Sequence, residues 1–318
     1  MCKKTMLLML MGVVLLWHAV PVTQADCGSV PYYSPLTLPR LLSLETFEGG
    51  KEKVNFDPMD VVVYEPGQRG IILWNGEEEI LLLSTDIKTS ETTQILEVIP
   101  FPSEPTVKLG DFETFRKMEK LLLEKTLWTV ASGGGVPVDV IEDAAEITFN
   151  AQMGAHDVTV VKVLNKRYFV DWVMQYMEKQ QAVNPKINPD FLKVINNYLE
   201  RDYKWFVFDT IVAQQEVQSH EPLEFRFKSQ SVYYPLEIST LETGKTNIEL
   251  LLLTPQPIKT YGELTFAVKR EKGVPLPAKD LTPVSADWAK FMKQRPMTMQ
   301  RVHIRGNISN MKEDFIVK

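Results

Sequence analysis

Short apolar runs of strand length recur along this chain, and only a few stretches repeat their apolar residues every three to four positions. Runs rich in Val, Ile, Leu, Phe and Tyr, bounded by turn residues, are typical of strands. They predict strands at residues 60–64, on both sides of Asn75-Gly76, and at 93–101, 146–152, 157–164, 205–212, 224–227, 233–238, 247–254, 264–269 and 299–304. Residues 65–68 predict a turn, residues 275–283 a loop, and residues 29–55 an extended lead-in without a clean period.

Polar residues suited to helix N-caps precede the stretches with helical spacing: Asp111, Asn165, Asn188 and Ser285. The helix expected after Asn165 carries an apolar stripe on one face, formed by Phe169, Trp172, Val173, Tyr176 and Met177. Consecutive elements usually lie side by side in space. We therefore expect this stripe to pack on the strand at 205–212 and to supply much of the core.

Strands before, between and after these helices predict an α+β fold, with a mostly antiparallel or mixed sheet and three to four helices packed on it. The chain of 318 residues is long enough to bury a substantial core. After a leader at 1–25, residues 26–318 are expected to form a single α+β domain, with a candidate sub-boundary near 215–222.

The acidic stretch after Asn75-Gly76 predicts a β-hairpin with a charged rim. Asn-Gly between apolar runs favours a type I′ turn, which needs positive φ at both central residues. With that turn, alternation places Glu77 and Glu79 on one face and Glu78 on the other. Because the three carboxylates do not converge, we expect exposed residues at the end of the hairpin, not metal ligands or catalytic acids.

Residues 1–25 have the layout of a secretory signal peptide. Two lysines precede an apolar run at 6–20, and small residues occupy the −3 and −1 positions before Asp26. The run is shorter than the about 20 residues that span a bilayer. We expect cleavage between Ala25 and Asp26 and export to the periplasm or the extracellular medium, with an uncleaved anchor as the alternative.

Cys27 would be the sole cysteine of the mature chain, because Cys2 leaves with the signal peptide. No internal disulfide can then form. Asp26 stands where a lipoprotein signal needs a small residue, which argues against lipidation of Cys27. A free thiol in an oxidising compartment can form an intermolecular disulfide, so Cys27 is a candidate contact to a second chain.

The net charge of the chain argues against two classes of partner, nucleic acid and anionic lipid. Removal of residues 1–25 takes away two lysines and no acidic residue, so the formal net charge changes from −6 to −8. An acidic chain without a basic run is poorly suited to sequence-independent binding of nucleic acid or anionic lipid. We expect no nucleic-acid partner and no transmembrane segment after signal removal, whereas a protein partner stays open.

Candidate reactive residues are few. His156-Asp157 lies at a predicted strand-to-strand turn and could serve a hydrolase with Cys27 or Ser132 as nucleophile. Ser132, however, stands in Ala-Ser-Gly-Gly-Gly and not in the Gly-x-Ser-x-Gly elbow. His156 is interpreted more simply as a polar turn residue, and His220 and His303 lie far along the chain.

Cofactor and metal motifs are missing from the sequence. The glycines at 133–135 lack the Gly-Lys-Ser/Thr ending of a P-loop, and there is no His-Glu-x-x-His, His-x-x-Glu-His or cysteine pair. We therefore assign no catalytic, cofactor-binding or metal-binding residue and expect no cofactor. Paired-carboxylate glycoside chemistry leaves no local motif and stays open.

Several segments, taken in order, resemble one family. They are Cys27-Gly28, Glu79-Ile80-Leu81, Ile99-Pro100-Phe101-Pro102, a helix centred on Trp172, Tyr203-Lys204-Trp205-Phe206-Val207, Pro222-Leu223-Glu224-Phe225-Arg226-Phe227 and Tyr234-Pro235-Leu236-Glu237-Ile238. This order resembles the uncharacterised secreted bacterial family known as domain of unknown function 2330. The resemblance implies export and a continuous α+β unit, but no activity, ligand or catalytic residue. The single mature cysteine departs from the family pattern, in which a second often follows closely, and puts an N-terminal disulfide in doubt.

Two functions remain. The first is a non-catalytic extracytoplasmic binding or assembly protein, and the second is a secreted hydrolase with an unrecognised site. The absence of a reactive constellation in the sequence favours the first. A deep polar pocket, and whether carboxylates or histidines converge in it, would discriminate between the two.

Overall fold

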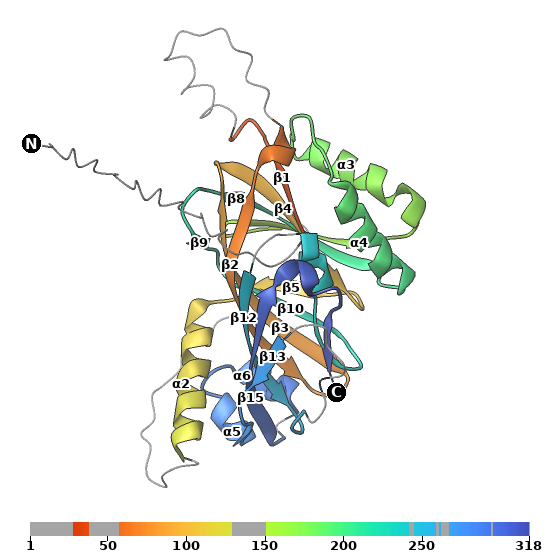
Figure 1. Ribbon diagram of the computed structural model, residues 1–318. Coiled ribbons are helices and arrows are strands. Elements are labelled where there is room, and N and C mark those ends of the chain that lie inside the picture. The colour runs from red at the N-terminus through yellow and green to blue at the C-terminus, as the bar shows by residue number, and fades with distance from the viewer. Residues whose placement is uncertain are drawn as a thin grey trace, which may run out of the picture.

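The computed structural model describes residues 28–37, 57–128, 151–241, 245–258, 261, 267–293 and 295–317. Within these ranges it has an α+β fold with two large sheets, a two-stranded sheet and five α-helices (Figure 1). The predicted fold class is confirmed. The helix count is slightly above the expected three to four, because α5 (Ala278–Leu281) forms inside the predicted loop at 275–283.

The smaller of the two large sheets is antiparallel throughout, in the order β1-β4-β8-β7-β6. Its strands are β1 (Gly28–Tyr32), β4 (Thr93–Phe101), β8 (Trp205–Ala213), β7 (His156–Lys162) and β6 (Ala151–Met153). The helices α3 (Phe169–Lys179) and α4 (Pro189–Glu200) cover one of its faces (Figure 1). Asn188 caps α4 as predicted, since its Oδ1 accepts from Asp190 N at 2.9 Å.

The stripe on α3 packs on β8, as expected, except at its outer edge. Its residues Phe169, Val173, Tyr176 and Met177 are buried in one cluster with Phe206 and Phe208. Trp172 is 39% exposed. Its ring lies over the others, with centroids 5.5 Å from Tyr176 and 5.7 Å from Phe208. Trp172 therefore covers this core and is not enclosed by it.

The other sheet runs β13-β15-β12-β2-β3-β10-β5, with β14 on β15 and β9 on β3. The bounds are β2 (Val63–Trp74), β3 (Glu78–Thr89), β5 (Thr106–Leu109), β9 (Gln218–Ser219), β10 (Leu223–Lys228), β12 (Lys245–Thr254), β13 (Ala267–Arg270), β14 (Val274–Leu276) and β15 (Met297–Asn307). Only β12 and β2 pair in parallel. The helices α2 (Phe112–Trp128), α5 and α6 (Ala286–Phe291) share a core cluster with the central strands. None of the described helices is long and apolar enough to cross a membrane.

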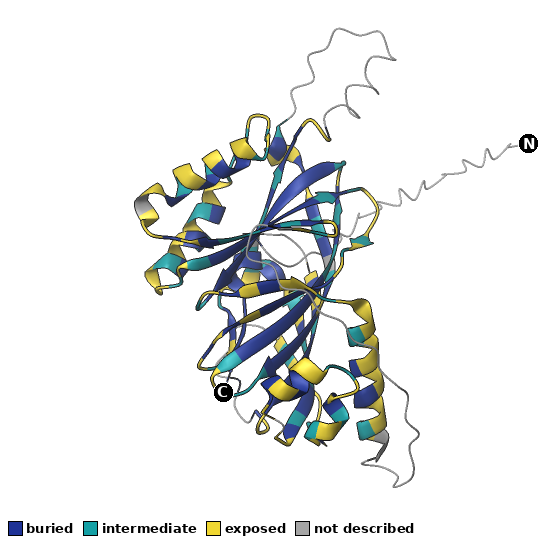
Figure 2. Cartoon of the chain, turned by 180° about the vertical axis from the view of Figure 1, so that it is seen from behind, coloured by how far each residue is buried: buried dark blue, intermediate teal, exposed yellow. Residues whose placement is uncertain are grey.

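The main core joins the two sheets. One buried cluster contains Ile99, Phe101 and Val207 from the five-stranded sheet together with Leu81 and Phe225 from the other. The Phe101 ring lies 5.0 Å from Phe225, centroid to centroid. Figure 2 shows the buried residues concentrated on the strands and the exposed ones on the outer sides of the helices. At the C-terminus, β16 (Phe315–Val317) pairs with β11 (Val232–Tyr234).

The first strands differ from the prediction. Part of the expected lead-in forms β1, and the expected turn at 65–68 lies inside β2, where the ladder to β3 shifts register between Tyr64 and Gly67. A β-bulge tolerates proline, which cannot donate to the ladder, so β2 continues through position 66. Residues 1–25, Cys27, Ser132 and the glycines at 133–135 lie outside the described residues.

The hairpin exists, but its turn is shifted by one residue. Asn75 N donates to Glu78 O at 3.1 Å, which leaves Gly76 and Glu77 as the central pair. Of the described residues here, only Gly76 has positive φ, at 101°. A type I′ turn over Asn75-Gly76 needs positive φ at both residues, so the predicted type I′ turn is wrong. Trp74 accordingly pairs with Glu79 and not with Glu77.

The expectation that all three glutamates are exposed is wrong for Glu79. Glu77 is exposed and Glu78 pairs with Arg226 at 2.8 Å, but Glu79 is fully buried. The strand β11 lies against the hairpin, and its Tyr233 N donates to Glu79 Oε2 at 2.8 Å. Burial raises the pKa of Glu79 well above its usual value. A distant segment thus turns an apparent rim residue into a core residue.

Candidate functional site

His156 occupies the start of β7, directly after a two-residue turn. Gly154, with φ of 61°, makes this tight connection to β6, and Met153 pairs with His156 across it. Strand alternation directs the His156 side chain to the face opposite α3 and α4, between the two sheets. There it is only 4% exposed. The interpretation of His156 as a polar turn residue is therefore wrong.

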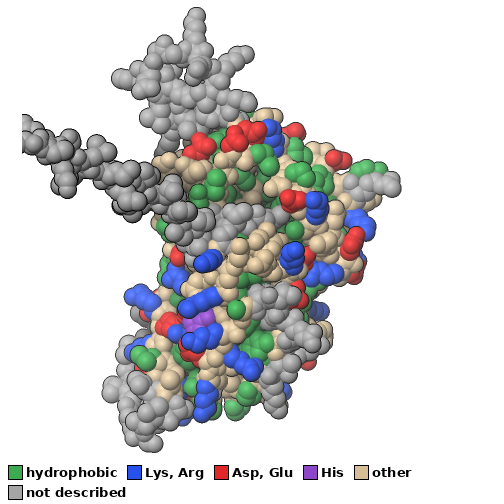
Figure 3. All heavy atoms as spheres, viewed as in Figure 1, with side chains coloured by type: hydrophobic (Ala, Val, Ile, Leu, Met, Phe, Trp, Pro, Cys, Tyr) green, Lys and Arg blue, Asp and Glu red, His purple; other side chains and the backbone are tan. Residues whose placement is uncertain are grey.

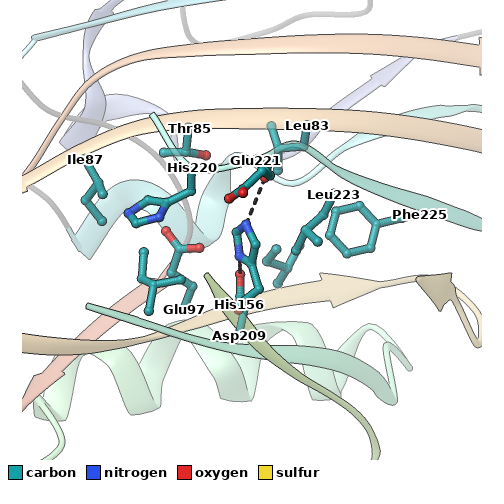
Figure 4. Close-up of a pocket in the computed structure, with 12 residues that line it drawn as sticks. Leu83, Thr85, Ile87, Glu97, His156, Asp209, His220, Glu221, Leu223 and Phe225 are labelled. Atoms are coloured by element: carbon teal, nitrogen blue, oxygen red, sulfur yellow. Dashed lines mark hydrogen bonds and ion pairs between the residues drawn. The ribbon is translucent and has the colours of Figure 1, made fainter. Parts of the chain in front are cut away.

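A buried histidine–aspartate pair forms at this point (Figure 4). His156 Nδ1 lies 2.6 Å from Asp209 Oδ2, and Nε2 lies 2.8 Å from the Glu221 carbonyl oxygen. A carbonyl only accepts, so Nε2 carries a proton, and an ionised Asp209 calls for a second proton on Nδ1. Burial lowers the pKa of His156, but the hydrogen bond and charge of Asp209 outweigh it and raise the pKa to about 9. The hydrogen-bond geometry and the raised pKa therefore favour an imidazolium at His156 facing the Asp209 carboxylate.

Further titratable groups surround the pair. Glu97 on β4 is the cross-strand neighbour of Asp209 and is buried. The His220 ring meets the His156 ring edge-on, with centroids 5.8 Å apart. Burial, followed by the charge of His156, lowers the pKa of His220. These groups line a cavity of about 20 Å³ between the sheets (Figure 4), which is room for about one water molecule.

This cluster does not have the geometry of a hydrolase site. Both nitrogens of His156 are held by fixed acceptors, so neither can take a proton from a nucleophile. Asp157, its neighbour in sequence, points to the opposite face of the sheet. His303 lies on β15 between Glu249 and Glu271, at 3.7 and 3.2 Å. Among the described residues, no group of three or more His, Cys, Asp and Glu could hold a metal ion.

A larger polar pocket of about 340 Å³ lies on the helix-covered face of the five-stranded sheet, beside the C-terminal end of α3. Its described lining consists of Ser34, Leu36, Gln94, Gln152, Ala155, His156, Asp157, Lys179, Gln180, Gln181, Thr210, Ile211 and Val212. Its volume falls in the range of small-molecule sites. His156 and Ile211 border both this pocket and the inter-sheet cavity.

The floor of the pocket contains polar groups without partners. Gln94 is 7% exposed and Thr210 is 6% exposed, and neither Gln94 Oε1 nor Thr210 Oγ1 has a hydrogen bond. The buried Tyr32 hydroxyl is the polar group beside Thr210 Oγ1, within reach of a hydrogen bond to it. Cross-strand pairing places Tyr32 beside Gln94, and Thr210 beside Asp157. Buried polar groups normally have partners, so this concentration is unusual.

One feature of the sequence points to the inter-sheet cluster although it belongs to no motif: acidic residues inside apolar strands. Asp209 interrupts the apolar strand at 205–212, and Glu97 interrupts the strand at 93–101. An acid inside a fully apolar strand must be paired when buried, which indicates a buried partner such as His156. No comparable signal pointed to Gln94 or Thr210, because single amides and hydroxyls are common in strands.

A family model described as "Uncharacterized protein conserved in bacteria (DUF2330)" matches residues 56–263. No curated protein matches the chain. Among solved structures, baculovirus P35 is similar with a TM-score of 0.40 and 10% identity, over 82% of this chain and 98% of that chain. A chain of the caspase-8/P35 complex is similar with a TM-score of 0.35 and 8% identity, over 84% and 99%.

Proposed function

The chain belongs to the family described as "Uncharacterized protein conserved in bacteria (DUF2330)", and from this premise we propose that it is an exported, non-catalytic binding protein whose ligand site is the polar pocket beside α3. The membership confirms the resemblance found in the sequence, and the family description names no activity. The proposal therefore depends on the pocket itself.

One observation supports the binding site above all: buried polar atoms without partners line a pocket of ligand size. Leaving a buried donor or acceptor unpaired costs about 1–3 kcal/mol. Gln94 Oε1 is one such atom, and Thr210 Oγ1 on the adjacent strand has the Tyr32 hydroxyl as its polar neighbour. A ligand that pairs with them would recover that free energy, whereas the unliganded fold gains nothing from them.

The chemistry of the pocket favours binding over hydrolysis. Glycoside hydrolysis needs two carboxyl groups flanking the bond that is cleaved. Asp157 is the one carboxylate among the described lining residues, and Gln180 Nε2 donates to its Oδ2 at 3.2 Å. His156 borders the pocket, but strand alternation turns its ring to the opposite face, where both ring nitrogens are engaged. The described lining thus holds polar contacts without an acid–base pair.

Export is supported by the amino-terminal pattern. Residues 1–25 have the basic start, apolar run and small-residue cleavage site of a secretory signal peptide. The acidic charge of the remaining chain and the mixture of acidic and basic side chains on the face in Figure 3 do not favour nucleic acid. A periplasmic or extracellular binding protein fits these features.

A rim substitution tests whether the pocket binds anything. Ala155 is exposed at the pocket edge, and Ala155→Trp should obstruct it, while the exposed Ala267→Trp on β13 is the matched control. Saturation-transfer NMR would use a mixture of neutral sugars, amino acids, organic acids and nucleosides. We expect at least one compound to bind the wild type and the Ala267→Trp variant but not Ala155→Trp. If no compound binds at millimolar concentration, or if Ala155→Trp binds equally well, the proposal is wrong.

A further inference from the structure

We propose that the pocket recognises a neutral, polyhydroxylated ligand, that is, a mono- or oligosaccharide. This inference rests on the proposed binding function and names its ligand class. It follows from the kinds of polar group in the lining, their charge balance and their placement on a rigid sheet.

Amides and hydroxyls dominate the polar lining. The pocket contains four glutamines, Gln94, Gln152, Gln180 and Gln181, together with the hydroxyls of Ser34 and Thr210. An amide offers two donors and an acceptor, and a hydroxyl both donates and accepts. Ligand hydroxyl groups have the same dual character. A sugar can therefore pair with every group in this set without a formal charge on either side.

Formal charge in the lining is balanced. Lys179 is exposed at the end of α3, and Asp157 lies opposite Thr210 on the sheet. Recognition of a carboxylate or phosphate usually employs arginine forks or several cations. The described lining has one lysine and no arginine, and the ring of its one histidine, His156, points to the opposite face of the sheet and pairs there with Asp209. A cationic ligand would depend on Asp157 alone, which Gln180 already contacts. A neutral ligand matches this arrangement better than either ion.

The polar groups lie in a row across the sheet. Cross-strand pairing joins Thr210 to Asp157 and Asp157 to Gln152, so three polar side chains on three strands face the same side. Such neighbours are about 5 Å apart. Gln180 holds the middle member, Asp157, because its Nε2 donates to both Asp157 Oδ2 and the Tyr176 hydroxyl at 3.2 Å. Polar side chains at this regular spacing can contact several hydroxyl groups of one sugar ring.

The pocket lining also offers apolar side chains to the C–H groups of a sugar. Leu36 is exposed at the rim, and Val212, which alternation places on the same face as Thr210, also lines the pocket. Sugars present C–H groups as well as hydroxyls, and these can rest on such aliphatic side chains. The lining therefore combines dual-character polar groups with a small apolar surface, as sites for small molecules usually do.

Matched threonine substitutions separate ligand binding from folding. Thr210→Val removes the unpartnered Oγ1 at the pocket, and Thr246→Val removes an equally buried, unpartnered Oγ1 on β12. Replacement of an unpaired buried hydroxyl by a methyl group should not lower stability. Both variants should thus melt at or above the wild-type temperature. Only Thr210→Val should lose binding.

The experiment measures dissociation constants by titration calorimetry and ligand-observed NMR. The probes are N-acetylglucosamine and maltose, glucuronate and glucosamine as charged sugars, and N-acetyl-trialanine amide as a neutral peptide. We expect the neutral sugars to bind more tightly than the charged ones, and Thr210→Val to weaken their binding at least tenfold while Thr246→Val leaves it unchanged.

Each of the other outcomes overturns one stated part of the proposal: the ligand class, the site or the binding function. If the peptide or a charged sugar binds in a Thr210-dependent manner and the neutral sugars do not, the ligand class is wrong but the binding function stands. If neutral sugars bind equally well to Thr210→Val, the site is wrong. If none of these probes binds and the mixture tested on Ala155→Trp also gives no binder, both the sugar inference and the proposed function are wrong.

Discussion

His156→Asn should remove a charge that stabilises the contact between the two sheets. Asparagine can still donate one hydrogen bond from roughly the position of Nδ1, but it cannot become a cation. Asp209, with 0% of its surface exposed, would then keep its negative charge without a counter-charge. The variant therefore tests the charge of the pair more than its packing.

The expected loss of folding free energy follows from the pKa of His156 in the folded state. An increase from 6.5 to about 9 corresponds to roughly 3 kcal/mol of folding free energy, and removing one partner of a buried pair typically costs about 3–5 kcal/mol. Because the pKa of His156 is higher in the folded state than in the unfolded chain, this stability is fully present below pH 6.5. It is lost as pH rises from 6.5 through about 9.

Urea unfolding at several pH values measures the effect. At pH 6, His156→Asn should lower the free energy of unfolding by about 3 kcal/mol, and the gap to wild type should shrink towards pH 9.5. The lowered pKa of His220 places its own titration below this window. Asp209→Asn should reduce the same pH dependence from the other side of the pair.

A parallel pH profile for wild type and His156→Asn between pH 6.5 and 9 would refute the reasoning. In that case the proton between His156 and Asp209 would reside on the carboxyl group, and the pair would be neutral. Burial does raise the pKa of Asp209, opposed by His156. The assay therefore decides whether the shared proton resides on His156, which gives an ion pair, or on Asp209, which gives a neutral pair.

Three further predictions concern processing and the core. Mass spectrometry of exported protein should find Asp26 at the N-terminus; a lipid-bearing N-terminal Cys27 would contradict the proposed cleavage. Thermal melting should show that Trp172→Ala costs about 2 kcal/mol, less than the about 3–5 kcal/mol for the buried Phe208→Ala, and equal losses would disprove the partial exposure of the tryptophan. Glu79→Gln should stabilise the protein above pH 5, because burial raises the folded-state pKa and stability is lost as pH rises above 4.5; a destabilised variant at pH 7 would argue for an ionised, partnered carboxylate.

Local chemistry accounted for most strands and for the helices other than α5, but the predicted Asn165 cap is wrong, because the N-cap of α3 is Tyr168. Asp111 accepts from Thr114 N at 2.6 Å, and Ser285 from Trp288 N at 3.2 Å, so both act as the predicted N-caps. Such signals are readable because cap and helix lie within a few residues of each other. The bulge at Pro66 was not predictable in the same way, because it depends on which strand pairs with β2.

The sites depend on contacts that no local pattern encodes. Asp209 could have been flagged as an acid in an apolar strand, but its partner stands 53 residues earlier. The polar pocket collects residues from β4, the β6–β7 turn, the end of α3 and β8, which only the folded sheet brings together. The buried Glu79 illustrates the reverse error, since a distant segment near Tyr233 covers a residue that looks exposed in sequence.

The parallel pairing of β12 with β2 also bears on the order of folding. Gln68 to Leu73 pair with Ile248 to Leu253, while all strands of the five-stranded sheet except β1 lie between them in the chain. This gives the protein a high contact order, and such topologies fold slowly. Until β12 arrives, the apolar edge of β2 stays open and can pair with other chains. A chain that ended at residue 241 should therefore aggregate instead of yielding a smaller folded unit, and a chaperone that shields β2 would raise the yield of the full-length protein.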